Sequence, residues 1–231
     1  MTAAVATWDP LQLPASGSPD RWPWLQGLRR AASVDPEPWL QAVEAGRLEP
    51  APDLLAALAD RLDGPAAARL LAWWLASPAA DPALLAVIGR RRHPPCRDLL
   101  RQTLEAPASS ASAQAAVLLP LLGHQRHPGD FQLLRDRALA PLPLRQRRAA
   151  LEGLAVGLRA WPVEALRQAL RCLVGDLDPG LAATAVDLLA RLPGGGQDLA
   201  ALDQGRLAPD LARRVERRLA GLGFAAPAGR S

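Results

Sequence analysis

Apolar residues recur at spacings of three and four along most of the chain, and residues 161–193 show this pattern most clearly. Pro162 can occupy a first helical turn, where its missing N–H costs nothing, and Gly175 can end that helix. Asp178 then has the position of an N-cap for a second helix. We therefore predict two short helices joined by a tight turn, with apolar stripes formed by Val163, Leu166, Leu170, Leu173 and Val174 and by Leu181, Ala185, Leu188, Leu189 and Leu192.

Smaller predictions concern the polar and small residues of the same region. Cys172 lies inside the first helical pattern, so we expect it to be buried or half-buried. Asp187 and Arg191 are four residues apart and should pair on the solvent side of the second helix. Gly153 and Gly157 lie one turn apart and predict a close approach between two helices.

The same helix–turn–helix plan recurs along the chain and predicts about six hairpins. An N-terminal helix at 20–32 precedes them as a cap, with Trp22, Leu25 and Leu28 facing inward. None of these helices is long enough to be stable alone, so each must be covered by its neighbours. The first helices are predicted to begin near Pro36, Pro65, Pro95, Gly129, Pro162 and Gly196, and the second helices near Pro52, Pro82, Ser110, Pro143, Pro179 and Pro209.

A regular spacing of prolines supports the repeat. Pro94, Pro128 and Pro162 are 34 residues apart, and the first two end identical Arg-His-Pro triplets. Self-similarity at this period is typical of solenoids. No alternation of β-branched and aromatic residues indicates a strand, so we predict an all-α fold. The expected boundaries are an irregular lead-in at 1–18, a single repeat domain at 19–222 and a flexible tail at 223–231.

The composition modifies this picture only modestly. The chain has 231 residues and a formal net charge of +4, and all its cationic side chains except histidine are arginines. Residues 1–89 hold 6 arginines against 10 acids, whereas residues 90–231 hold 21 against 13. The later part therefore suits an acidic partner, although solvated helix faces would carry the same excess. No apolar stretch could span a bilayer, and no cofactor motif or signal peptide is present, so we expect a cytoplasmic protein without membrane insertion.

The second helix of the clearest hairpin resembles a known repeat. It reads Asp-Pro-Gly-Leu-Ala-Ala-Thr-Ala-Val-Asp-Leu-Leu over 178–189 and is similar to the short bacterial HEAT-like repeats called phycobilisome-lyase-like repeats. In that family an Asp opens the second helix, as Asp178 does here, whereas Ala182 stands where an Arg is usual. The resemblance covers roughly 35–222 and implies a right-handed α-α superhelix (a HEAT-like solenoid).

Two sets of side chains are candidates for binding a partner. The resemblance implies that second helices line the concave side, where arginines could bind an acidic protein surface or a phosphate backbone. Trp73 and Trp74 are adjacent, so their indoles point in different directions, and one of them should be partly exposed. Ordinary surface arginines and an aromatic core would give the same sequence. The candidate partner-binding residues are Arg90, Arg91, Arg145, Arg148, Arg213, Arg217, Trp73 and Trp74.

Histidine and cysteine suggest a further, weaker site. His93 and Cys96 lie in one predicted linker, and His124 and His127 lie in the next. Pairs separated by two residues resemble zinc spacing. Duplication of the Arg-His-Pro linker explains the same pairs without a metal, so the sequence leaves both interpretations open.

No catalytic constellation is evident, which favours a non-enzymatic role. Serines cluster in linkers, and carboxylates occur singly at predicted helix starts, where they stabilise the helix dipole. The HEAT-like resemblance implies a scaffold or adaptor for another protein, and its narrower form implies a phycobiliprotein accessory such as a bilin lyase or chaperone. HEAT-like repeats are also used by bacterial DNA glycosylases that act on alkylated DNA, so nucleic-acid binding is the alternative.

Overall fold

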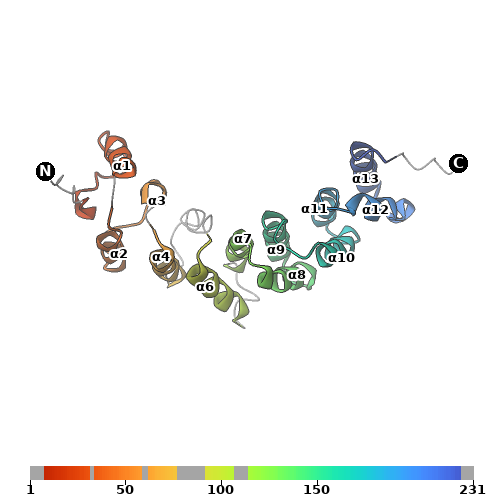
Figure 1. The fold of residues 1–231 in the computed structure, drawn as a ribbon, viewed down its shortest axis with the longest axis horizontal. Helices are drawn as coiled ribbons and strands as arrows, with labels where there is room; N and C mark the ends of the chain where they lie inside the picture. The colour runs from red at the N-terminus through yellow and green to blue at the C-terminus, as the bar shows by residue number, and fades with distance from the viewer. Residues whose placement is uncertain (1–7, 32–33, 59–61, 77–91, 107–113, 225–231) are drawn as a thin grey trace. The chain divides into compact units, whose positions relative to one another are not determined.

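The computed structural model describes residues 8–31, 34–58, 62–76, 92–106 and 114–224. Every regular element within these ranges is a helix, and Figure 1 shows their succession along the chain. The chain divides into two compact units, Met1–Pro107 and Ala108–Ser231, which are described separately below.

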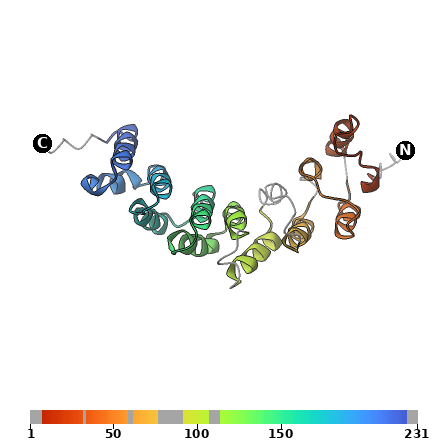
Figure 2. The ribbon, with the colours of Figure 1, turned by 180° about the vertical axis from the view of Figure 1, so that it is seen from behind.

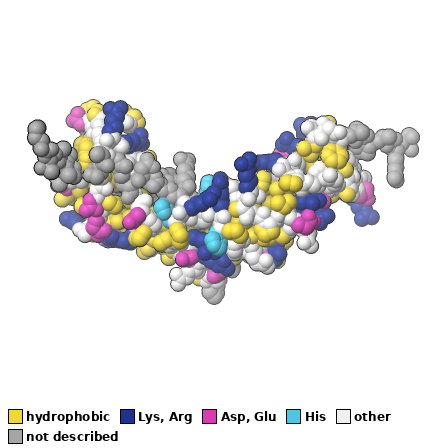
Figure 3. All heavy atoms as spheres, viewed as in Figure 1, with side chains coloured by type: hydrophobic (Ala, Val, Ile, Leu, Met, Phe, Trp, Pro, Cys, Tyr) yellow, Lys and Arg dark blue, Asp and Glu magenta, His cyan; other side chains and the backbone are white. Residues whose placement is uncertain are grey.

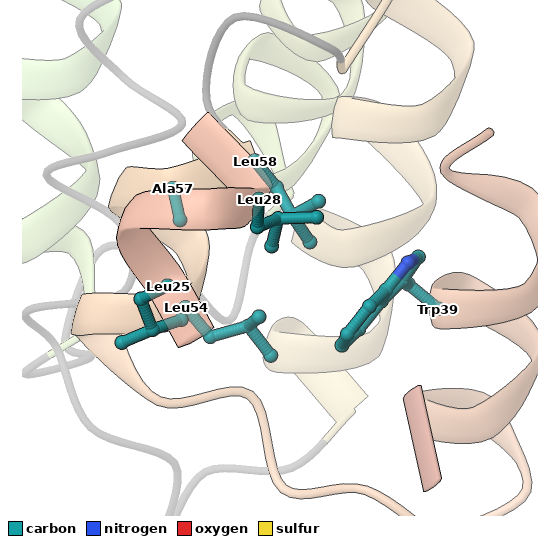
Figure 4. Close-up of a cluster of buried hydrophobic side chains, with 6 residues drawn as sticks. All are labelled: Leu25, Leu28, Trp39, Leu54, Ala57 and Leu58. Atoms are coloured by element: carbon teal, nitrogen blue, oxygen red, sulfur yellow. The ribbon is translucent and has the colours of Figure 1, made fainter. Parts of the chain in front are cut away.

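Helices of the first unit pack mainly against the helix two places along the chain. Contacts join α1 to α3, α2 to α4, and α4 to α6. Beside the first of these contacts, Leu25, Leu28, Leu54 and Leu58 form a buried cluster with Trp39 (Figure 4). The described elements of this unit are η1 (Pro10–Gln12), α1 (Arg21–Arg30), α2 (Glu37–Glu44), α3 (Pro52–Leu58), α4 (Gly64–Ala76) and α6 (Pro94–Glu105).

The second unit contains two rows of helices. One row runs from α7 through α9 and α11 to α13, and the other from α8 through α10 to α12, because each helix contacts the next member of its own row. Figure 2 shows the same helices from behind. The elements are α7 (Ala115–Gln125), η3 (Pro128–Asp130), α8 (Phe131–Leu139), α9 (Leu144–Val156), α10 (Val163–Val174), α11 (Pro179–Leu189), α12 (Gly195–Ala200), η4 (Gln204–Arg206) and α13 (Pro209–Gly221).

The all-α prediction is confirmed for the described residues, and most predicted helix starts agree with the structure. Pro94 begins α6, Pro128 begins η3 before α8, and Pro162 is the N-cap of α10. The three equally spaced prolines therefore lie at the starts of three alternate helices, α6, α8 and α10. The predicted helix starts near Pro82 and Ser110 lie outside the described residues.

Local caps explain why the central hairpin folds as predicted. The carboxylate of Asp178 accepts a hydrogen bond of 2.8 Å from the backbone N–H of Leu181, which satisfies one orphan donor of α11. Gly175 is the C-cap of α10. Both apolar stripes are buried except at Val163, which is 41% exposed. Val163 is the first residue of its helix, and helical side chains point back toward the N-terminus, so this one extends past the helix end.

The structure corrects the predicted position of Trp22. Leu25 and Leu28 are buried as expected, but Trp22 is 61% exposed and lies under the guanidinium of Arg29, with 5.7 Å between the guanidinium carbon and the ring centroid. The third inward position of α1 belongs to Arg21, which is held there by Asp53.

Two further predictions are wrong. Cys172 is exposed, because the buried face of α10 is centred on Leu170 and Leu173 and Cys172 falls on the opposite side. The expected pair between Asp187 and Arg191 is replaced by ion pairs from α13 to Asp187. Helix α11 ends before Arg191, which removes the one-turn spacing that the pair requires.

Candidate protein-interaction surface

Arginine–carboxylate pairs connect each helix row from one hairpin to the next. Each pair joins two helices, or a helix and its cap, that lie two places apart along the chain. Because the partners are 25 to 32 residues apart in sequence, the ion pairs follow the period of the repeat. The pairs are Arg21 with Asp53, Arg69 with Glu37 and Glu44, Arg148 with Asp178, Arg167 with Asp198, and Arg214 and Arg218 with Asp187.

These pairs are geometrically well formed. Arg21 Nε lies 2.7 Å from Asp53 Oδ2, and Arg167 Nε lies 2.6 Å from Asp198 Oδ2, with a second guanidinium nitrogen bonded to the other carboxylate oxygen in both cases. The adjacent guanidinium lowers the pKa of Asp53 and of Asp198 from its usual value. Arg21 and Arg167 therefore have a packing role that their sequence positions alone did not show.

On α9, the predicted arginines lie at the solvent side. Arg145 and Arg148 are exposed and three residues apart, so they share one helix face. Arg148 Nη2 donates to Asp178 Oδ2 at 2.9 Å and so contacts the N-cap of α11. Between them, Arg147 binds Asp176 and donates to the carbonyl of Ala138 at 3.0 Å. Arg145 alone of the three has no ion pair within the described residues.

On α13, the predicted arginines are also exposed. Arg213 pairs with Asp210 one turn earlier, and Arg217 Nε donates to the carbonyl of Arg213 at 3.4 Å. Arg214 and Arg218 of the same helix make the more ordered contacts, because both bind Asp187 on α11. Figure 3 shows arginine side chains on the side of the second unit that carries α9, α11 and α13.

Asp187 is the electrostatic centre of the α11–α13 contact. Both of its oxygens accept hydrogen bonds from Arg214, and Arg218 Nε lies 2.9 Å from Oδ1. The hydrogen bond from Arg214 is the main reason that the pKa of Asp187 falls to about 2, with Arg218 adding to the effect. The sequence held a usable signal for this site, since Asp187 precedes Arg214 by 27 residues, close to one repeat.

An apolar groove lies beside the same helices and was not predicted. It has a volume of ≈450 Å³ and lies between the α10–α11 turn and the segment leading into α13. Leu177 at its edge is fully exposed at 102%, although leucine is normally among the buried residues. The apolar lining includes Leu207, Leu211 and Ala182, and the charged residues Asp176, Arg206, Asp210 and Arg214 complete it.

The two tryptophans belong to the first unit. Trp74 is buried at 4% exposure, whereas Trp73 is half-buried, as the adjacent positions predicted. Trp73 lines a separate groove of ≈450 Å³ together with Leu48, Pro50 and Pro52. Trp73 and the described arginines of α9 and α13 therefore belong to different units, and Trp74 is not at the surface. Arg90 and Arg91 lie outside the described residues.

The histidine and cysteine candidates also divide between the units. Cys96 is buried at 1% exposure, and burial raises the pKa of its thiol to about 11, which disfavours the thiolate that binds metals. His127 Nδ1 accepts a hydrogen bond of 3.2 Å from the N–H of Gly129 and so caps a local turn. His93 and His124 are half-buried. Among the described residues, no group of three or more His, Cys, Asp or Glu could hold a metal ion.

Comparison with known proteins returned no match. No protein-family model, curated protein or solved structure is similar to this chain at a significant level. Within the described residues, no helix has both the length and the apolar character needed to cross a membrane.

Proposed function

We propose that this protein is a non-enzymatic helical-repeat adaptor that binds an acidic protein surface through the row α7–α9–α11–α13. The observation that carries the proposal is the charge of this row. Its helices hold seven arginines against four carboxylates, and the arginines lie on α9 and α13. Asp176 and Asp178, which precede α11, pair with Arg147 and Arg148, so the excess comes mainly from Arg145 and the arginines of α13. Such an excess favours and steers the approach of an acidic partner. In this proposal the two helix rows continue as the right-handed HEAT-like superhelix that the sequence resemblance implies.

The apolar groove supports a protein partner over a nucleic acid. Interfaces between proteins combine an apolar centre with a charged rim, and the groove beside exposed Leu177 offers such a centre next to the arginines of α13. Asp176 and Asp210 also line it, and each is paired with an arginine, Arg147 and Arg213 respectively. A partner that inserts an apolar side chain and carries acidic groups around it fits this surface.

The proposal is tested with a photo-crosslinking amino acid placed at Leu177 in the full chain. Crosslinked partners are identified from cells that express the protein natively, and capture is repeated with Arg145→Glu/Arg217→Glu. This double variant reverses two exposed charges of the row. We expect it to reduce capture at least about fivefold, and we expect capture to weaken with added salt because exposed charges are screened.

A matched control reverses two arginines outside the row. Arg135 lies on α8 and Arg159 lies in the connection between α9 and α10, so Arg135→Glu/Arg159→Glu changes the net charge equally. Equal loss of capture in both double variants would show that only total charge matters. Absence of any partner that depends on Arg145 and Arg217 would refute the proposal.

The remaining alternatives have their own tests. Phycobiliprotein assistance is a narrower form of the proposal that rests on the resemblance alone, and purified phycobiliproteins provide its direct binding assay. For the DNA alternative, a gel shift with duplex and alkylated duplex DNA is run at low salt, where electrostatic binding is strongest. DNA binding that depends on Arg145 and Arg217 without protein capture would favour that alternative instead.

A further inference from the structure

Three arginines of α13 together line one hollow at the surface of the second unit. Arg214, Arg217 and Arg218 are its whole described lining, and its volume is ≈220 Å³. The three residues follow the spacing i, i+3, i+4, which places them on one face of the helix. A second hollow of ≈350 Å³ shares Arg217 and Arg218 and adds Asp187 of α11 and Arg191 from the turn that follows α11. Arginines of α13 and of this turn thus line neighbouring hollows.

Two of these guanidiniums are held in place before any ligand arrives. Asp187 binds Arg214 through both oxygens and Arg218 through Oδ1. The carboxylate uses only Nε of Arg218, so both terminal amino groups of Arg218 have no acceptor within the described residues. Arg217 likewise uses only Nε, on the carbonyl of Arg213. The terminal amino groups that face the hollow therefore have N–H donors without acceptors, while the same side chains are already held through Nε. This prior ordering lowers the entropy cost of binding a ligand.

The charge balance of the hollow favours an anion. Three guanidiniums face a single carboxylate, Asp187, which leaves two positive charges uncompensated at this position. The low pKa of Asp187 means that it stays ionised and keeps ordering its partners at neutral pH. Planar guanidinium groups bind phosphate oxygens through paired N–H donors, which a cluster of ammonium groups would not do with the same geometry.

We propose that Arg214, Arg217 and Arg218 form a binding site for a phosphate-type dianion. The ligand is either inorganic phosphate or the phosphomonoester of a phosphorylated protein partner, and the second source rests on the proposed adaptor function. In both cases Arg217 and Arg218 donate to the phosphate oxygens from their terminal amino groups. Arg214 contributes its positive charge while its Nε and Nη2 remain bound to Asp187.

The test is isothermal titration calorimetry of the full chain with three ligands. These are sodium phosphate, a short peptide containing phosphoserine, and the same peptide with serine, all compared with sodium chloride at equal ionic strength. We expect phosphate and the phosphopeptide to bind and the serine peptide not to bind. Tighter binding of the phosphopeptide than of phosphate assigns the site to a partner's phosphomonoester, and equal or weaker binding assigns it to a small anion.

Variants of α13 separate a built site from general charge. Arg217→Gln removes donors from the hollow and leaves the pairs to Asp187 intact, so we expect phosphate affinity to fall about tenfold or more. Arg213→Gln removes the same charge from the same helix but outside the hollow lining, and should change affinity less than about twofold. Arg217→Lys keeps the charge without the planar fork and should give an intermediate loss.

Two results would overturn the anion site. One is phosphate binding that does not exceed chloride at equal ionic strength, and the other is equal weakening by Arg213→Gln and Arg217→Gln. Because these titrations use purified ligands, failure of the anion site leaves the crosslinking test of the adaptor unaffected. Failure to capture a partner likewise leaves phosphate binding measurable.

Discussion

Gly123 on α7 and Gly153 on α9 meet so closely that a Cβ atom added to Gly123 would lie 2.2 Å from the carbonyl oxygen of Gly153. Gly153 is restricted as well, because a Cβ atom added there would lie 2.8 Å from the carbonyl oxygen of Leu119 on α7. The two backbones can touch only because neither residue has a side chain. This contact sets the spacing at the start of the α7–α9–α11–α13 row.

Substitution of Gly123 tests the importance of this approach. We expect Gly123→Ala to lower the free energy of unfolding by about 2 kcal/mol, because backbone must move to admit the methyl group. The better helix propensity of alanine, worth about 1 kcal/mol, would only partly offset this loss. Urea unfolding monitored by circular dichroism gives the value. Gly221→Ala on α13 is the control, since nothing lies within 4 Å of a Cβ there, and stability should not fall.

If Gly123→Ala proved as stable as Gly221→Ala, the α7–α9 contact would have to be looser than the structure shows. A lower stability of Gly153→Ala would provide an independent check on the same contact, because that residue approaches Leu119 from the other helix.

Asp198 should matter for stability more than most carboxylates of the chain. Its side chain is 6% exposed and accepts hydrogen bonds from both Arg167 and Arg171. Asp198→Asn removes the charge and places an amide N–H₂ against cationic donors, so we expect a loss of about 1–3 kcal/mol in urea unfolding. The control is Asp210→Asn, whose side chain is 93% exposed and whose ion pair is therefore weak. An equal shift of the unfolding midpoint in both variants would contradict the structural role of Asp198.

The Asp187 ion pairs predict a specific acid sensitivity. Hydrogen bonding by Arg214 lowers the pKa of Asp187 from 3.8 to about 2 in the folded protein. Because the folded pKa is lower than the unfolded one, the stabilisation is complete above about pH 4 and is lost as the pH falls through about 2. We expect Asp187→Asn to be less stable than wild type at pH 6, with the two unfolding midpoints converging between about pH 4 and pH 2. A constant difference between the unfolding midpoints of the two proteins from about pH 4 to about pH 2 would show that Asp187 is not held by these arginines.

The two cysteines should differ sharply in reactivity. Cys172 is exposed, whereas Cys96 is buried and the pKa of its thiol is raised to about 11. Since the thiolate is the reactive form and must be accessible, a thiol reagent at pH 7.5 should label about one site per native molecule. The second site should react only after unfolding in urea. Cys172→Ser should abolish the fast phase, and retention of that phase would place Cys96 at the surface instead.

The sequence by itself determined where most helices of the described chain begin. Helix starts at Pro94, Asp178 and Pro209 depend on local chemistry, namely proline in the first turn and a side chain that caps the backbone. Apolar spacing then identified the buried face of α10 and α11, because the period of a helix is a property of the chain alone. The different exposure of Trp73, which is half-buried, and Trp74, which is buried, also follows from their adjacent positions in the helix.

Only the tertiary structure decided which arginines are engaged and which remain available. Arg21 takes an inward position from Trp22 because Asp53 on α3 meets it there, and Asp187 binds Arg214 and Arg218 rather than Arg191. These choices depend on carboxylates about one repeat away, which come into reach only when the helices of a row pack together. The apolar groove at Leu177 has the same origin, since packing brings the α10–α11 turn next to the start of α13. The arginines of the hollow share one face of α13 through their spacing in the sequence, whereas packing supplies the carboxylate of Asp187 that holds two of them.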